Sequence, residues 1–309
     1  MESLDHVLST AKNYKGLKRK LQIGEIVQIL GETSYDDAGV LEVGDLKIVV
    51  STDGIAEDLV KSDPWFAGYY SVLVNVNDVV VKGAKPMGYV NVISGTSETR
   101  RRMAEGIRVG LDKYDVKLLK GHTHPDSTYE AIDAAVVGVA KRVAKGTNAK
   151  PGDKLIMAID LDGAFGVKGW VKCFDSTLNK TKAELQRMIS AIVTLIDNGC
   201  ITASRDVSAP GILGSLAMLC EASAVGAEID LAKIPRPGSI SLSEWIVSYP
   251  AMGFIFASKS KETLELLREV GFSAEIVGQF TESKKIYCQL GNERGTFMDL
   301  GLESVFGLR

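Results

Sequence analysis

Residues 65–84, with the sequence WFAGYYSVLVNVNDVVVKGA, form an apolar run without a turn signal. Its density of β-branched residues is typical of a strand, whereas its length without a turn favours a helix. Asp63 and Pro64 stand directly before the run, in the order of an N-cap residue and a proline at the first helical position. We therefore expect a buried helix that begins at Pro64.

Strand patterns and helix patterns alternate over the rest of the chain. The expected strands cover residues 25–30, 40–44, 46–51, 87–94, 116–120, 131–141 and 154–160. Amphipathic helices are expected from Ser97 to Tyr114 and from Thr181 to Gly199, the second beginning with a capping box of Thr181 and Glu184. This alternation predicts the α/β class, with α+β layered packing as its variant.

The length of the chain, 309 residues, suits two domains of about 150 residues each. Residues 144–153, AKGTNAKPGD, are a polar stretch with glycine and proline between two apolar runs, which is typical of a domain boundary. We expect an N-terminal extension at 1–24, a first domain at 25–145 and a second domain at 151–309.

Composition and charge argue against several classes of protein. The net charge of −3 and the pI near 5.8 leave no basic footprint for nucleic acid. No stretch approaches the roughly 20 apolar residues that a membrane-spanning helix needs, and no signal-peptide pattern is visible. The four cysteines are far apart and form no CxxC pair, so we expect buried thiols and a cytoplasmic location.

Two of the three histidines, His122 and His124, lie in the segment KGHTHPD at 120–126. At positions i and i+2 of a strand they would share a face and could both bind a metal. Zinc needs three or four ligands, however, and both His6 and the nearest cysteine, Cys173, are remote in sequence. A zinc site is therefore disfavoured, and hydrogen bonding by His124 within its own turn is the simpler alternative.

Aspartates stand beside turn signals at several points of the chain. They are Asp36, Asp37, Asp53, Asp78, Asp126 and Asp206. Any one of them could be an ordinary turn residue. Together they suit magnesium, which is held by a few carboxylates and by substrate phosphates. The sequence has no P-loop, no dinucleotide-binding G-x-G-x-x-G after a strand and no G-x-S-x-G nucleophile elbow.

Five segments resemble, in order, motifs of the AIR synthase superfamily. They are YDDAGVL at 35–41, STDGIAEDL at 51–59, VNVNDVVVKGAKPMG at 74–88, KGHTHPD at 120–126 and ITASRDVSAPGILGSLAMLCEASAVGAEID at 201–230. This superfamily of ATP-dependent enzymes groups aminoimidazole ribonucleotide synthetase, thiamine-monophosphate kinase, selenophosphate synthetase and a hydrogenase-maturation dehydratase. The KGHTHPD variant looks closest to an uncharacterised branch that includes methanogenesis marker protein 2.

The resemblance implies a two-domain AIR synthase-like fold whose N-terminal strands form a shared sheet in a homodimer. It also implies ATP and Mg²⁺ as cofactors and a small molecule as substrate. The residues implied as magnesium ligands are Asp36, Asp37, Asp53 and Asp78. Further residues implied at the nucleotide site are Ser51, Thr52, Gly54, Asn75, Gly121, His122, Thr123 and Asp126. A catalytic role is implied for Asp206 and His122.

Departures from the superfamily pattern affect the expected reaction. The kinase and synthetase branches carry an acid at the position of His122, where we expect a protonated imidazole to contact a phosphate oxygen. Selenophosphate synthetase also has a histidine at this position. The cysteine-containing loop of that enzyme is missing from the present sequence, in which the first cysteine is Cys173. The sequence predicts ATP- and Mg²⁺-dependent phosphoryl transfer to a small molecule. The alternative, favoured by the altered DVSAPG segment at 206–211, is a non-catalytic ATP-binding assembly or sensor module.

Overall fold

The structure is a computed structural model that describes residues 2–31, 35–166 and 169–307. The helices are α1 Leu4–Asn13, α2 Lys15–Lys18, η1 Arg19–Gln22, α3 Gly24–Ile29, α4 Glu57–Ser62, α5 Pro64–Val81, α6 Ser97–Tyr114, α7 Lys182–Asp197, α8 Gly211–Ala222, η2 Leu231–Lys233, α9 Leu242–Trp245 and α10 Glu262–Glu269. The strands are β1 Gly39–Val43, β2 Leu46–Gly54, β3 Lys85–Ser94, β4 Lys117–His124, β5 Ala131–Ala140, β6 Lys154–Ile159, β7 Ala164–Phe165, β8 Cys173–Asp175, β9 Ile201–Asp206, β10 Gly226–Asp230, β11 Tyr249–Pro250, β12 Gly253–Ser258, β13 Ser273–Thr281, β14 Lys285–Leu290 and β15 Glu293–Asp299.

Helix α5 is the buried helix that the apolar run predicts. Asp63 caps it by accepting a hydrogen bond from the Phe66 amide, and Pro64 is its first residue. It packs closely against α6, because a Cβ atom at Gly68 would come within 2.0 Å of the Met103 carbonyl oxygen. The same two helices meet again at Gly106, where a Cβ atom would overlap the backbone of α5. Bare glycine backbone therefore lets the two helices form one compact layer.

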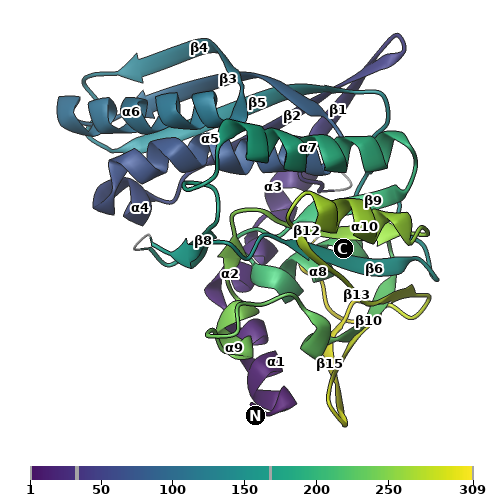
Figure 1. The fold of residues 1–309 in the computed structure, drawn as a ribbon. Coiled ribbons are helices and arrows are strands. Elements are labelled where there is room, and N and C mark those ends of the chain that lie inside the picture. The colour runs from purple at the N-terminus through teal and green to yellow at the C-terminus, as the bar shows by residue number, and fades with distance from the viewer. Residues whose placement is uncertain (1, 32–34, 167–168, 308–309) are drawn as a thin grey trace.

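The first sheet consists of five strands in the order β1-β2-β5-β3-β4. All neighbours are antiparallel except β3 and β4, which are joined through α6 and run parallel. Helices α5 and α6 cover one face of this sheet, and the opposite face lies open at the top of Figure 1. The open arrangement leaves apolar side chains exposed, among them Leu41, Val50 and Val92.

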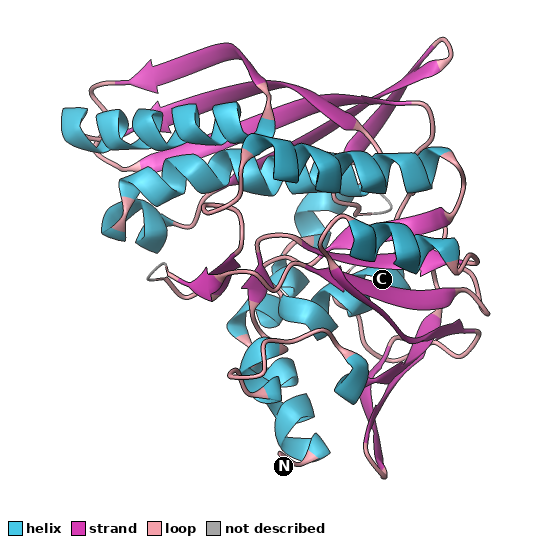
Figure 2. Cartoon of the chain, viewed as in Figure 1, coloured by secondary structure: helices cyan, strands magenta, loops and turns pink. Residues whose placement is uncertain are grey.

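The second sheet consists of seven strands in the order β15-β14-β10-β13-β6-β12-β9, and a small third sheet has the order β11-β8-β7. Helix α8 is buried along its length against the second sheet, and α7 spans the space between the two large sheets (Figure 2). The capping box of Thr181 and Glu184 at the start of α7 is confirmed, and Gly199 after its end has φ +74°. The expected α/β class and a two-part architecture are confirmed.

The N-terminal extension packs on the second part of the chain. Leu4, Val7 and Leu8 of α1 belong to the same hydrophobic core as Ile212 and Phe297. The extension is therefore anchored beside the larger sheet, and it carries η1 into the space between the two sheets.

Two expected elements differ from the structure. Residues 25–30 are mostly helix α3 and not a strand, because Val27 packs inward and the Gly24 backbone lies against the Phe306 carbonyl oxygen. The segment 121–124 is not a turn but the end of β4, because its backbone pairs with Asn91–Ser94 of β3. In both places long-range pairing or packing overrides the local pattern.

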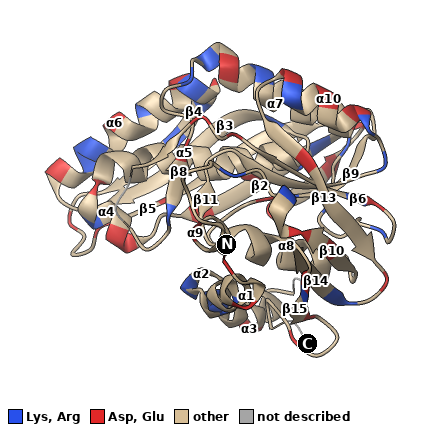
Figure 3. Cartoon of the chain, turned by 60° about the horizontal axis from the view of Figure 1, so that its bottom comes forward, with Lys and Arg blue, Asp and Glu red and all other residues tan. Residues whose placement is uncertain are grey.

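Charged side chains of both signs alternate along the outer helices α6, α7 and α10 (Figure 3). Such mixed surfaces are typical of ordinary solvent-facing helices. Among the described residues, no helix is long and apolar enough to cross a membrane.

Candidate active site

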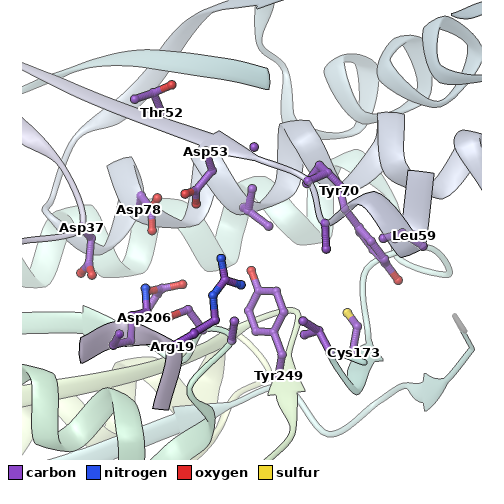
Figure 4. Close-up of a pocket in the computed structure, with 18 of the residues that line it drawn as sticks. Arg19, Asp37, Thr52, Asp53, Leu59, Tyr70, Asp78, Cys173, Asp206 and Tyr249 are labelled. Carbon is purple, nitrogen blue, oxygen red and sulfur yellow. The ribbon is translucent and has the colours of Figure 1, made fainter. Parts of the chain in front are cut away.

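A cavity of about 210 Å³ lies where η1, the loop before β1, strand β2, helix α5 and the strands β8, β9 and β11 meet. Helix α5 contributes Tyr70, Val74 and Asp78, which are four residues apart and therefore lie on one face of the helix. Figure 4 shows Asp37, Asp53, Asp78 and Asp206 at one side of this cavity and Tyr70, Leu59 and Cys173 at the other, with Arg19 and Tyr249 between them.

Three carboxylates form a cluster in the cavity. Asp37, Asp78 and Asp206 each offer an oxygen, and these oxygens all lie within 4.8 Å of one another. Asp206 is the last residue of β9, Asp78 is on α5, and Asp37 is in the loop before β1, so the cluster joins both parts of the chain. Ser51 of β2 holds the cluster in place by donating a hydrogen bond of 2.6 Å to Asp78 Oδ2.

The surroundings oppose ionisation of these groups. Burial, followed by repulsion from Asp206, Asp53 and Asp37, raises the pKa of Asp78 well above its usual range. Burial and repulsion from Asp37 do the same for the pKa of Asp206, although the nearby Arg205 works in the opposite direction. The pKa of Asp53 is also raised, first by burial. Such an arrangement favours protons or a cation among the carboxylates.

Buried cations hold the loop that carries Asp37. Lys82 Nζ lies 2.6 Å from Asp36 Oδ1 and 3.0 Å from Asp37 Oδ2. Arg205 Nη2 lies 3.0 Å from Asp37 Oδ1. Asp36 also accepts a hydrogen bond of 2.8 Å from the Gly146 amide, so its oxygens serve the loop and not the carboxylate cluster. The expected role of Asp36 as a metal ligand does not match this arrangement.

The donor set of the cluster fits a hard divalent cation. Magnesium prefers oxygen ligands and is commonly held by one or two carboxylates together with substrate phosphates and water. Asp37, Asp78 and Asp206 supply carboxylate oxygens at mutual distances that one ion can bridge, and Asp53 lines the same cavity. Among the described residues the cluster includes no sulfur or imidazole ligand, in keeping with magnesium.

The structure brings only part of the expected nucleotide site together. Thr52, Asp53 and Gly54 line the cavity, and Ser51 reaches it through its hydrogen bond with Asp78. Asn75 does not line the cavity; it is buried in α5, where its side-chain amide donates a hydrogen bond of 2.9 Å to the Ser71 carbonyl oxygen.

Residues of the KGHTHPD segment lie apart from this cavity in the chain. Gly121, His122 and Thr123 are on β4, an exposed edge strand, and Asp126 follows in the exposed turn after it. His122 pairs with Val92, whose side chain is exposed on the open face of the sheet. His122 does not line the cavity, because β4 and β1 are at opposite edges of the sheet; its contact with a phosphate oxygen stays a prediction.

The sequence pattern missed several residues that line the cavity. Arg19 and Lys20 come from η1, Tyr249 is the first residue of β11, and Cys173 is the first residue of β8. Burial raises the pKa of the Cys173 thiol to about 12, so this thiol stays protonated and unreactive. No local motif marks these residues, because tertiary folding alone brings them to the aspartates.

Two family models match the two parts of the chain. Residues 35–140 match the N-terminal domain of AIR synthase related proteins, and residues 150–291 match the C-terminal domain. An uncharacterised protein of Methanocaldococcus jannaschii is 34% identical over 99% of this chain and 99% of its own. Thiamine-monophosphate kinase of Pyrococcus abyssi is 24% identical over 88% of this chain and 90% of its own.

Solved structures share the fold. Thermotoga maritima PurL complexed with ADP has a TM-score of 0.77 at 16% identity; the match covers 94% of this chain and 51% of that one. AaThiL complexed with AMPPCP and TMP has a TM-score of 0.70 at 17% identity and covers 90% of this chain and 96% of its own. With both family models matched and a relative aligned along nearly its whole length, the chain belongs to the AIR synthase-related family.

Proposed function

We propose that this protein is an ATP- and Mg²⁺-dependent enzyme that transfers a phosphoryl group to a small molecule. The observation that carries the proposal is the cluster of Asp37, Asp78 and Asp206, buried in a cavity between the two parts of the chain. Relatives support it, because they include a thiamine-monophosphate kinase and a selenide, water dikinase, and a structural neighbour is complexed with AMPPCP.

Asp37, Asp78 and Asp206 would hold magnesium, with Asp53 beside them. The ion would neutralise charge on the nucleotide phosphates, which is its usual contribution to phosphoryl transfer. The protein itself contributes by fixing the positions of the carboxylates. Arg205 fixes one oxygen of Asp37, and Ser51 fixes one oxygen of Asp78, so the carboxylates are oriented before the ligand arrives.

The opposite side of the cavity is suited to the acceptor. Leu59 and Cys173 provide apolar walls there, and Tyr70 is held by a hydrogen bond of 2.9 Å to Asp175 Oδ2. Apolar walls exclude water, which competes with the acceptor for the phosphoryl group. An acceptor bound there lies across the cavity from the carboxylates, so its nucleophilic atom can face the phosphates.

We also propose that the protein is a homodimer joined through the open face of the five-stranded sheet. The exposed apolar side chains on the strands of this sheet include Leu41, Val43, Leu46, Val50, Val90 and Val92. Contiguous exposed apolar patches and open strand edges mark interaction sites. In a dimer with two-fold symmetry, the open sheet face of each copy would pack against the same face of the other copy and be buried there.

The nucleotide proposal is tested by thermal unfolding. ATP should raise the unfolding midpoint only with Mg²⁺ present, because carboxyl groups and phosphates can share this site only around a bridging cation. At a ligand concentration of about 100 times Kd, the expected stabilisation is about 2.7 kcal/mol. Asp53→Asn should abolish most of the shift, whereas Asp45→Asn, in the exposed turn between β1 and β2, should preserve it. An equal shift without Mg²⁺ would contradict the proposal.

A further inference from the structure

We propose that Arg19, Lys20 and the hydroxyl group of Tyr249 form a subsite for an anionic group, a phosphate or a carboxylate, inside the cavity. The proposal rests on the proposed function and deepens it. The subsite has its own donors, which come from η1 and β11, whereas the metal cluster is built from carboxylates of other elements.

The two cations are held at the cavity by aromatic rings. The Arg19 guanidinium carbon lies 5.1 Å from the centre of the Trp170 ring, and Lys20 Nζ lies 5.7 Å from the centre of the Tyr35 ring. Stacking on a ring orients a cation and leaves its N–H groups free to donate. In Figure 4 the Arg19 side chain points into the cavity.

Neither cation forms a close ion pair with a carboxylate, although both attract Asp53 across the cavity. Within the described parts of the chain, Arg19 and Lys20 form no salt bridge, although both line a cavity that contains several aspartates. Arg205, which also lines the cavity, is paired with Asp37, and Lys82 behind it is paired with Asp36 and Asp37. The donor groups of Arg19 and Lys20 therefore remain available to a ligand, and a bound anion would counter the effect of burial, which lowers the pKa of Lys20.

Tyr249 is an independent observation that points to a ligand. Its side chain is only 8% exposed, and its hydroxyl oxygen has no hydrogen-bond partner within the described residues. Tyr249 lines the cavity, and in Figure 4 its ring stands beside Arg19 with the hydroxyl directed into the cavity. A buried hydroxyl without a partner is costly, and a ligand oxygen would satisfy it. Burial raises the pKa of Tyr249 well above its usual value, so the hydroxyl keeps its proton and can donate it in a hydrogen bond.

The anionic group can belong to the nucleotide or to the acceptor, and two calorimetric titrations distinguish these sources. The first measures binding of Mg²⁺–AMPPCP. The second measures binding of inorganic phosphate, both to the protein alone and to protein saturated with Mg²⁺–AMPPCP. The variants are Arg19→Gln with Lys20→Gln combined, Tyr249→Phe, and the control Lys18→Gln. Lys18 is exposed on the neighbouring turn and bonded to Asn13.

The double variant loses charge-assisted hydrogen bonds, so its affinity for the anionic ligand should fall by about tenfold or more. Tyr249→Phe loses one neutral hydrogen bond, so its affinity for the same ligand should fall less. A loss in the first titration identifies a nucleotide phosphate as the occupant. A loss confined to the second, with saturated protein, identifies an acceptor anion. Lys18→Gln should match the wild type.

The proposal is overturned if the double variant stays within about twofold of the wild type in every titration, a difference well below one charge-assisted hydrogen bond. A different result would contradict the proposed function. If the wild type binds no Mg²⁺–AMPPCP, the nucleotide assignment fails, and the phosphate titration of the protein alone still decides whether the subsite exists.

Discussion

Asp78 and Asp206 sit in surroundings that favour their neutral forms in the metal-free protein, with consequences for stability. The pKa of each is raised above its usual value of 3.8, first by burial and then by neighbouring carboxylates. The unfolded chain releases these protons near the usual value, whereas the folded chain retains them to higher pH. Stability from this source is therefore present at low pH and is lost as pH rises from 3.8 through the folded-state pKa.

The free energy of unfolding of the metal-free protein should accordingly be lower at about pH 8 than at about pH 5. Asp78→Asn removes one of these titrations and should flatten the difference, while Asp45→Asn should leave it unchanged. Saturating Mg²⁺ should reverse the trend, because the ion competes with protons for the carboxylates. Urea unfolding in chelator and in Mg²⁺ measures both effects. An unaltered pH slope in Asp78→Asn would show that this carboxyl group is not a source of the dependence.

Some cavity residues could be predicted from sequence and others could not. Asp37, Asp53, Asp78 and Asp206 stand in recognisable motifs beside strand and helix ends, and the cavity contains all four. His122 stands in an equally recognisable motif, yet strand pairing places it on an exposed edge. Motifs identify residues that act through local backbone geometry, whereas Arg19 and Tyr249 reach the cavity through packing of distant segments.

Helix α5 connects the cavity to the second part of the chain. Asp78 lies on it in the cavity, and one turn later Lys82, the C-cap residue, is completely buried. Lys82 Nζ donates a hydrogen bond of 2.7 Å to the Ser204 carbonyl oxygen of β9, in addition to its ion pairs with Asp36 and Asp37. One side chain thus joins the end of α5, the loop before β1 and the strand that carries Asp206.

Lys82→Met should destabilise the protein by about 3–5 kcal/mol, because it leaves the Asp36 carboxylate without its cation and leaves Asp37 with Arg205 alone. Lys61→Met is the matched control: its partner Glu57 and Lys61 itself are both exposed, so its loss should cost about 0–1 kcal/mol. Denaturant unfolding of both variants provides the comparison. A loss below about 1 kcal/mol for Lys82→Met would mean that the buried network contributes no more than a surface pair.

At the level of elements, long patterns were predicted better than short ones. The buried helix at α5 and the capping box of α7 follow from length and from a specific pair of residues. The segment 25–30 has only a short apolar run, which a strand and a helix can both use, and contact with the C-terminal residues selects the helix. The secondary structure of such short segments is decided by tertiary contacts with residues that are distant in the sequence.

The whole molecule has one large sheet face that helices do not cover, and this feature underlies the proposed dimer. Light scattering at micromolar concentration should give a mass near twice the chain mass of 33.2 kDa. Val50→Lys places a charge on the open face, opposite Val137 and Gly39, and should yield monomers, because a buried unpaired charge is costly. Leu302→Lys, at an exposed apolar residue of the C-terminal segment, should leave the mass unchanged. A monomeric wild type would remove the dimer proposal and leave the cavity argument intact.

The central claim is that the carboxylates of both parts of the chain bind one metal–nucleotide complex. The most direct test is anomalous diffraction from crystals grown with Mn²⁺, as a substitute for Mg²⁺, and AMPPCP. We expect an anomalous peak bound by Asp37, Asp78 and Asp206, with the nucleotide phosphates on the cavity side of the ion. Nucleotide and metal bound elsewhere, with these three carboxylates free of both, would contradict it.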